Sequence, residues 1–219
     1  MHRLKQTVIA AWVFLLFFLL SPSLFADGQG WINHSITFTL NPKINLKLTK
    51  ETRCHDVTYA NPYLKNIQGG FVYKHSQSFY VAALFKKAHS EKASLILNEN
   101  RFTLETGWKT DLAKGLEFSL RFRTEIRRYD SELADDHLRF RFRIRLKSRF
   151  NIGSLRLKPF IATETFGKDK FYTIQGNRLY IGTTFPLTDH VEIVVNYIRY
   201  DIKNKETIHI LNSGINLKF

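Results

Sequence analysis

The clearest pattern in the chain is an unbroken alternation of apolar and cationic residues from Leu138 to Lys147. Side chains two positions apart in a β-strand point to the same face, so Leu, Phe and Ile would share one face and Arg and Lys the other. A helix would spread the same charges around its whole circumference. A tilted strand needs about ten residues to cross a bilayer. The segment predicts either a membrane-barrel strand with its cations toward the lumen, or a soluble-sandwich strand with its cations in water.

Strand-like alternation recurs along the chain, and the connections between the alternating runs favour the barrel over the sandwich. The polar segments 54–66, 86–92 and 128–136 are expected to be loops. Short connections of about three to five residues alternate with long ones of about six to thirteen, as in barrels with tight turns at one end and longer loops at the other. A soluble sandwich gives no reason for this alternation.

We therefore predict an all-β fold that consists of a single antiparallel transmembrane β-barrel. About eleven strands are apparent, but bacterial single-chain barrels have even strand numbers, so we expect about twelve strands, with ten as the alternative. An odd number would leave the first and last strands pointing to the wrong ends of the barrel. The missing strand would lie before Trp31 or within 54–66.

The beginning of the chain has the pattern of a secretory signal peptide. A short basic segment precedes the apolar run Val8–Leu20, whose length of about 13 residues is too short for a spanning helix. Cleavage is expected after Ala26, with cleavage after Ser23 as the alternative; a retained anchor helix is the less favoured interpretation. The chain is thus divided into a signal peptide, residues 1–26, and an outer-membrane β-barrel, residues 27–219.

The composition agrees with an exported membrane protein that has a cationic interior. Lys and Arg outnumber Asp and Glu by 33 to 19, which gives a formal net charge of +14 at pH 7. Aromatic residues make up 14% of the chain, with 19 Phe and 9 Tyr, as expected for aromatic girdles at membrane interfaces. Cys54 is the only cysteine, so an intramolecular disulfide is excluded.

Several features along the chain form a loose signature. They are Trp31, Arg53, the arginine-rich strand from Leu138, the segments 158–166 and 177–182, and the terminal segment Ile210–Phe219. This set resembles an uncharacterised Gram-negative outer-membrane β-barrel family, domain of unknown function 2490. Ile161 departs from the family pattern, in which an aromatic residue or Val is commoner there. The resemblance implies an integral barrel in the outer membrane of a Gram-negative cell, and it implies no activity.

The last strand resembles the C-terminal sorting signal of Gram-negative barrels, so the barrel assembly machinery is an expected partner. The residues of this signal would be Leu211, Ile215, Leu217 and Phe219. Outer-membrane lipid and lipopolysaccharide are the other expected partners. Nucleic acid is not expected to meet an exported chain. Loop cations would contact the lipopolysaccharide phosphates, and the candidates are Arg127, Arg128, Lys168 and Lys170.

If the apolar faces meet lipid, the opposite faces bring charged side chains into the lumen. A shift of one residue in the strand from Leu138 would place its arginines in lipid, at about 2–4 kcal/mol each near the midplane, so the register is fixed. The expected lumen-lining residues are Glu51, Arg53, Arg101, Glu105, Glu117, Arg121, Arg123, Glu125, Arg139, Arg141, Arg143, Arg145, Lys147, Arg156, Lys158, Glu164 and Arg178.

Two functional interpretations of this lumen are open. In the first, an Arg–Glu network fills a closed structural barrel in place of a hydrophobic core. In the second, a narrow porin-like path contains water, and its surplus of cations favours anions.

Catalysis is a less favoured third class. A lipid hydrolase or protease at the rim would need Ser, His or Asp side chains close together, and the histidines are scattered along the chain. His89, Asp135, Asp136 and His137 are the least weak candidates because they fall on expected loops. We assign no catalytic, cofactor or metal residues, since one Cys and dispersed His give no ligand cluster.

Overall fold

The computed structural model describes residues 28–92, 95–130, 134–152, 155–169 and 173–219. The predicted signal peptide lies outside these residues. The strands are β1 (Gln29–Asn41), β2 (Ile44–Cys54), β3 (Pro62–Lys74), β4 (Phe79–Lys92), β5 (Leu95–Ala113), β6 (Leu116–Tyr129), β7 (His137–Ser148), β8 (Phe150–Ile152), β9 (Leu155–Lys168), β10 (Ile174–Pro186), β11 (Val191–Ile202) and β12 (Ile208–Lys218). No helix among the described residues is long and apolar enough to span a membrane.

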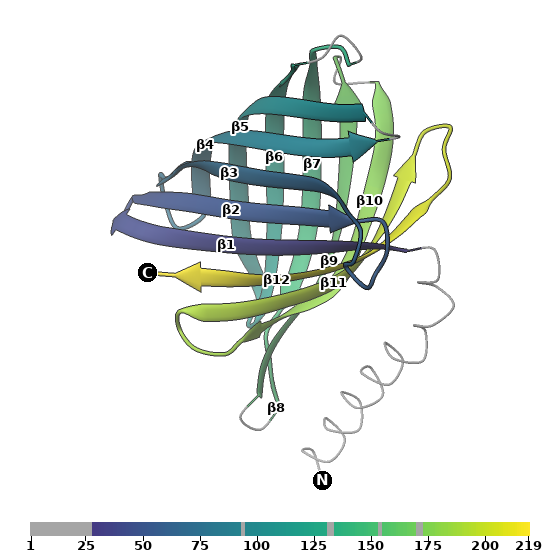
Figure 1. Cartoon of the computed structure of the whole chain (residues 1–219). Coiled ribbons are helices and arrows are strands. Elements are labelled where there is room, and N and C mark those ends of the chain that lie inside the picture. Colours follow the sequence, from purple (N-terminus) through teal and green to yellow (C-terminus); the bar gives the residue numbers. More distant parts are fainter. Residues whose placement is uncertain (1–27, 93–94, 131–133, 153–154, 170–172) are drawn as a thin grey trace.

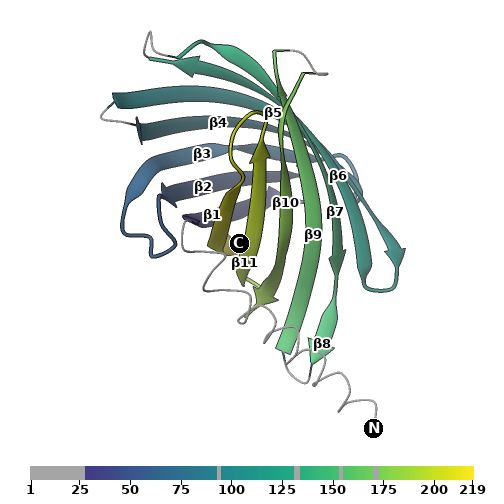
Figure 2. The same ribbon diagram turned by 90° about the vertical axis from the view of Figure 1, so that its right-hand side faces the viewer.

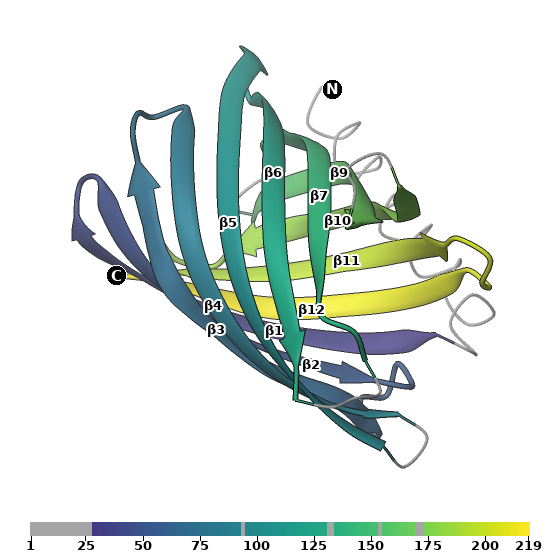
Figure 3. The same cartoon turned by 90° about the horizontal axis from the view of Figure 1, so that it is seen from above.

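The strands close into a barrel, which Figure 1 shows from the side and Figure 3 from above. Eleven strands form the wall, because β8 pairs only with β9 and lies outside it. Each wall strand is antiparallel to its neighbours except at the seam, where β1 and β12 are parallel. The predicted all-β barrel and its total of twelve strands are confirmed. Because the wall has an odd number of strands that alternate in direction, its first and last strands run the same way. This explains why the two ends of the chain do not fit an even-numbered barrel.

The outer surface of the wall is apolar on every side. On β7 the even-numbered residues face outward, and Phe142 keeps 38% of its surface exposed. Monomeric soluble proteins rarely expose apolar surface of this extent. The sandwich alternative is wrong, because no second sheet of the described chain covers these side chains. Exposed apolar residues include Phe38, Leu48, Phe71, Phe85, Phe102, Leu104, Leu146, Ile161, Ile181 and Ile215.

The two ends of the barrel differ in their connections. We call one end the turn end, with connections 42–43, 75–78, 114–115 and 187–190. The opposite end is the loop end, with connections 55–61, 130–136, 169–173 and 203–207. The two-residue connection 93–94 is the exception to the expected alternation of lengths. The hairpin of β8 and the start of β9 extends beyond the wall at the turn end (Figure 2).

The C-terminal residue belongs to the seam at the turn end. The backbone N–H of Phe219 donates to the Thr37 carbonyl at 2.9 Å, and the Phe219 carbonyl accepts from Thr39 at 2.7 Å. Its ring stacks on Phe38, with centroids 5.9 Å apart, and on His190 at 6.0 Å. Trp108 and Phe118 make a further aromatic pair at this end. These rings form part of an aromatic girdle of the kind found at barrel–membrane interfaces.

Two expected loops are wrong in their bounds. β3 begins at Pro62, so only 55–61 remains of the predicted loop 54–66. The segment 86–92 belongs to β4 and pairs with β5 along its length. Polar residues occupy both faces of β4 after Phe85, which hides the alternation although backbone pairing continues. The missing strand is neither before Trp31 nor within 54–66.

The parallel seam predicts a specific cross-link. Ile36 lies opposite Leu217 and both face outward, whereas Ser213 lies opposite Ile32. In a Cys54→Ser background, Ile36→Cys with Leu217→Cys should oxidise readily to a disulfide, because paired Cα atoms fall within the range a disulfide spans. The closed loop should migrate faster than the reduced chain on a denaturing gel. Equal cross-linking of the out-of-register control, Ile36→Cys with Ser213→Cys, would contradict the seam.

Candidate functional site

Glu164 is the centre of one half of a charge network in the lumen. Its side chain on β9 has no exposed surface. Its carboxylate lies 2.8 Å from Arg121 and 3.3 Å from Arg143, and it also contacts Arg141. The hydroxyl of Tyr180 donates to it at 2.9 Å. One carboxylate thus compensates cations from two neighbouring strands, β6 and β7.

Glu125 on β6 is the second fully buried carboxylate. It accepts hydrogen bonds from Arg139 at 2.7 Å and from Arg141 at 2.9 Å. Arg101 and Arg123 lie 3.3 and 3.6 Å away. Since Arg141 contacts both Glu125 and Glu164, it links the two carboxylates into a single network.

Carboxylates on β5 extend the network toward β4 and the loop end. Glu105 accepts from Tyr80 and from the Nε of Arg123, both at 2.8 Å. Glu99 lies 2.6 Å from both Arg101 and Arg127. Arginines on neighbouring strands that would repel one another therefore share these carboxylates.

The opposite half of the lumen contains a buried apolar cluster. Trp31, Tyr180, Ile198 and Ile210 form a buried cluster with Ala162. These side chains come from β1 and from β9–β12, where asparagine side chains such as Asn212 also face inward. The barrel interior thus combines a hydrophobic core on one side with an ionic core on the other.

Arg178 lies where the two halves meet. Its guanidinium lies over the ring of Tyr200 at 4.2 Å and over Trp31 and Phe166 at 5.3 Å each. Arg178 is buried, and its nearest carboxylate oxygen, on Glu164, is 3.9 Å away. Aromatic faces hold this cation by cation–π attraction.

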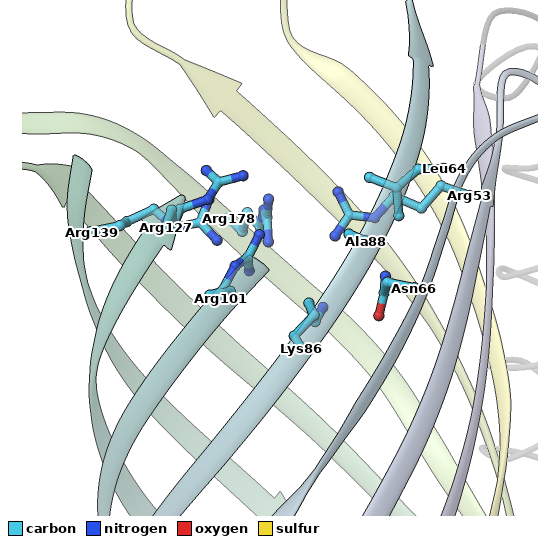
Figure 4. Close-up of a pocket in the computed structure, with 9 residues that line it drawn as sticks. All are labelled: Arg53, Leu64, Asn66, Lys86, Ala88, Arg101, Arg127, Arg139 and Arg178. Carbon is cyan, nitrogen blue, oxygen red and sulfur yellow. The ribbon is translucent and has the colours of Figure 1, made fainter. Parts of the chain in front are cut away.

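A hollow of ≈ 50 Å³ lies just inside the loop end (Figure 4). Arg53, Arg127 and Arg139, which line it, each lie within two residues of the loop end of their strands. Its walls come from β2 to β7 and from β10, so residues on distant parts of the wall approach one another across the lumen. The lining residues are Arg53, Leu64, Asn66, Lys86, Ala88, Arg101, Arg127, Arg139 and Arg178.

Comparison with known proteins identifies the family. A family model described as "Protein of unknown function (DUF2490)" matches residues 28–209, from before β1 to the start of β12. The chain belongs to this family. Among solved structures, LpxR from Salmonella typhimurium is similar, at 9% sequence identity and a TM-score of 0.47, with 80% of this chain and 83% of that chain covered. A search of curated proteins finds no match.

The DUF2490 barrel turns most of the sequence-predicted lumen residues inward. The residues placed there are Glu51, Arg53, Arg101, Glu105, Glu117, Arg121, Arg123, Glu125, Arg139, Arg141, Arg143, Arg145, Lys147, Lys158, Glu164 and Arg178. Arg156 is the correction. It lies on the hairpin of β8 and the start of β9, beyond the residues of β9 that pair with β7, and it is exposed and 3.9 Å from Asp189.

Residues that the sequence interpretation missed or misplaced lie mainly at the loop end. Arg127 was expected to face lipopolysaccharide but faces the lumen and pairs with Glu99. Lys86 was not recognised, because it lies in the segment 86–92 that was taken for a loop. Glu99 was not recognised, because it precedes the alternating run that starts at Arg101. Residues two apart in a strand face the same way, so extending the strand from Arg101 toward the N-terminus would have placed Glu99 in the lumen as well. Arg128 is exposed, Lys168 is half-buried, and Lys170 lies outside the described residues.

The weak catalytic candidates are not brought together. His89 on β4 is exposed and contacts Asn98 at 2.9 Å. His137 on β7 contacts the Asp135 carbonyl at 2.9 Å, while Asp136 accepts from the backbone of Tyr129. Across the described ranges, no group of three His, Cys, Asp or Glu residues could hold a metal ion.

Neutralising a central carboxylate of the network should destabilise the barrel. We expect Glu164→Gln to lower the free energy of unfolding by about 3–5 kcal/mol, because Arg121, Arg141 and Arg143 lose their shared counter-charge while buried. Urea unfolding of the refolded barrel, followed by tryptophan fluorescence, measures this.

The matched control is Glu91→Gln, whose side chain is 66% exposed. It should leave unfolding unchanged within experimental error, because surface charges contribute little. If Glu164→Gln were as stable as this control, the carboxylate would not support the network.

Proposed function

We propose that this DUF2490 member is an integral outer-membrane β-barrel with a closed lumen, stabilised from within by ion pairs. The observation that carries the proposal is the burial of Glu125 and Glu164, which have 0% of their surface exposed although they lie in the interior of β6 and β9, away from the strand ends. Water does not reach these carboxylates. A barrel built in this way is a rigid structural body whose outer surface and loop end are available for contacts.

The apolar outer surface supports a place in the membrane. Its side chains cover the wall on all sides, and the aromatic girdle at the turn end suits an interface. In this orientation the turn end faces the periplasm and the loop end faces outward. Outer-membrane lipid and lipopolysaccharide surround the barrel, with exposed Arg128 available to lipid phosphates.

The last strand supports recognition by the barrel assembly machinery. Leu211, Ile215 and Leu217 share the outward parity of β12 with the terminal residue Phe219. We propose that the assembly machinery recognises this regular series of outward apolar side chains.

The packing of the lumen favours a closed barrel over the porin-like anion path. A water-filled path past β6 and β9 would expose Glu125 and Glu164. Arg143 on β7 lies over the ring of Tyr180 on β10, at 4.6 Å, so side chains bridge the interior beyond neighbouring strands. We propose no catalytic role, since the candidate histidines and aspartates are dispersed.

The proposal predicts the protein's location and its behaviour on gels. The protein should appear in the outer-membrane fraction, and its unboiled band should migrate differently from the boiled band, because a folded barrel resists detergent without heating. Recovery in the soluble periplasmic fraction would contradict the membrane assignment.

The closed lumen predicts an absence of conductance. Purified barrel in planar bilayers should give no single-channel steps, while a porin prepared in the same way serves as the positive control. Reproducible steps with anion selectivity would contradict the closed lumen and support the porin-like path.

A further inference from the structure

The hollow at the loop end carries an excess of positive charge. Four carboxylates pair with its cations: Glu51, Glu99, Glu125 and, at 3.9 Å from Arg178, Glu164. Glu125 and Glu164 are both shared with arginines deeper in the lumen. Six of the nine lining residues are cations, namely Arg53, Lys86, Arg101, Arg127, Arg139 and Arg178. Buried cations at this density need a counter-charge that the surrounding carboxylates do not supply.

Arg178 is the arginine of the hollow with the fewest polar contacts. Its side chain is 7% exposed, and its Nε is buried without a hydrogen-bond partner. Its guanidinium makes no hydrogen bond to any part of the chain that the structure describes. The rings of Trp31, Phe166 and Tyr200 fix its orientation, so its terminal nitrogens are preorganised at the edge of the hollow (Figure 4).

Lys86 supplies a second cation on a different side of the hollow. The residue is 8% exposed, and within the described ranges its ammonium group makes no hydrogen bond and no direct ion pair. Figure 4 shows its side chain pointing toward the same space as Arg101 and Arg178. Buried donors are normally hydrogen-bonded, so the unpaired Nε of Arg178 and the unpaired ammonium group of Lys86 beside one space indicate a missing acceptor.

We propose that this hollow is a binding site for a small tetrahedral oxyanion of the phosphate class. A space of ≈ 50 Å³ holds about four water-sized atoms, which matches the four oxygens of phosphate. Arginine recognises such oxygens by charge-assisted hydrogen bonds, and Lys86 adds a point charge. The site does not depend on the closed lumen or on the membrane assignment.

The hollow lies behind the mouth of the loop end, so a ligand enters from that side. Two sources share the required chemistry: free inorganic phosphate, and a phosphate group carried by lipopolysaccharide. An oxyanion of this class can accept from Arg178 and Lys86 together, so the site discriminates by anion shape and charge. Chloride has neither the oxygens nor the size to contact Arg178 and Lys86 together.

Calorimetric titration of the refolded full-length barrel with inorganic phosphate, at constant ionic strength set by chloride, tests the site. Wild-type protein should bind phosphate, and Arg178→Gln and Lys86→Met should each weaken binding by about tenfold or more, as expected for loss of one charge-assisted contact. The matched controls are Arg199→Gln, whose side chain is 54% exposed on the outer face, and Lys87→Met, next to Lys86 but facing outward. Both controls should bind like wild type.

Heat-modifiability gels establish that each variant is folded, and Arg178→Lys, which keeps the charge, serves as a second variant with intermediate affinity. A parallel titration with phosphorylated and dephosphorylated lipopolysaccharide distinguishes the sources. Arg178-dependent binding of only the phosphorylated lipid would assign the lipid phosphate, and Arg178-dependent binding of inorganic phosphate would assign the free anion. The inference is overturned if neither inorganic phosphate nor phosphorylated lipopolysaccharide binds, or if Arg178→Gln and Lys86→Met bind phosphate as tightly as wild type.

Discussion

The structure depends on the pairing of two buried carboxylates with arginines on adjacent strands. Glu125 and Glu164 each contact several guanidinium groups, and Arg141 contacts both. Burying an ion is costly unless opposite charges and hydrogen bonds compensate it. The arginines cannot turn outward, because lipid is a worse environment for them than a lumen that holds carboxylates. The position of these two glutamates therefore fixes which face points inward on the strands that carry their arginine partners.

This constraint explains the divided interior. On β5–β7 and β9, charges occupy the inner face and compensate one another. On β1 and β10–β12, the inner face is apolar around Trp31, Ile198 and Ile210. Arg178 joins the halves, with aromatic rings on one side and the cationic hollow on the other. Within the described residues, the hollow at the loop end has a lining rich in cations, and an anion has access there.

The sequence was sufficient to predict the fold class and the ionic half of the lumen. Strict alternation in β6 and β7 determines which residues face inward, because the strand period is two. It was insufficient where both faces of a strand are polar, as in β4 from Lys86 onward, because such a strand shows no apolar–polar alternation and cannot be distinguished from a loop. The parallel seam was also hidden, since strand pairing between the ends of a chain leaves no local pattern. The apolar half and the hollow arise from packing between strands far apart in the sequence.

The direct test of the central claim is a nitroxide scan of β7, with a single cysteine placed in turn at residues 138–147 in a Cys54→Ser background. Collision rates with lipid-soluble oxygen and with a water-soluble nickel complex report the environment of each position. Oxygen accessibility should be high at even positions such as Phe140 and Phe142, and both rates should be low at odd positions such as Arg141 and Arg143. High nickel accessibility at the odd positions, with the even positions shielded from both reagents, would contradict an arginine network enclosed by a barrel.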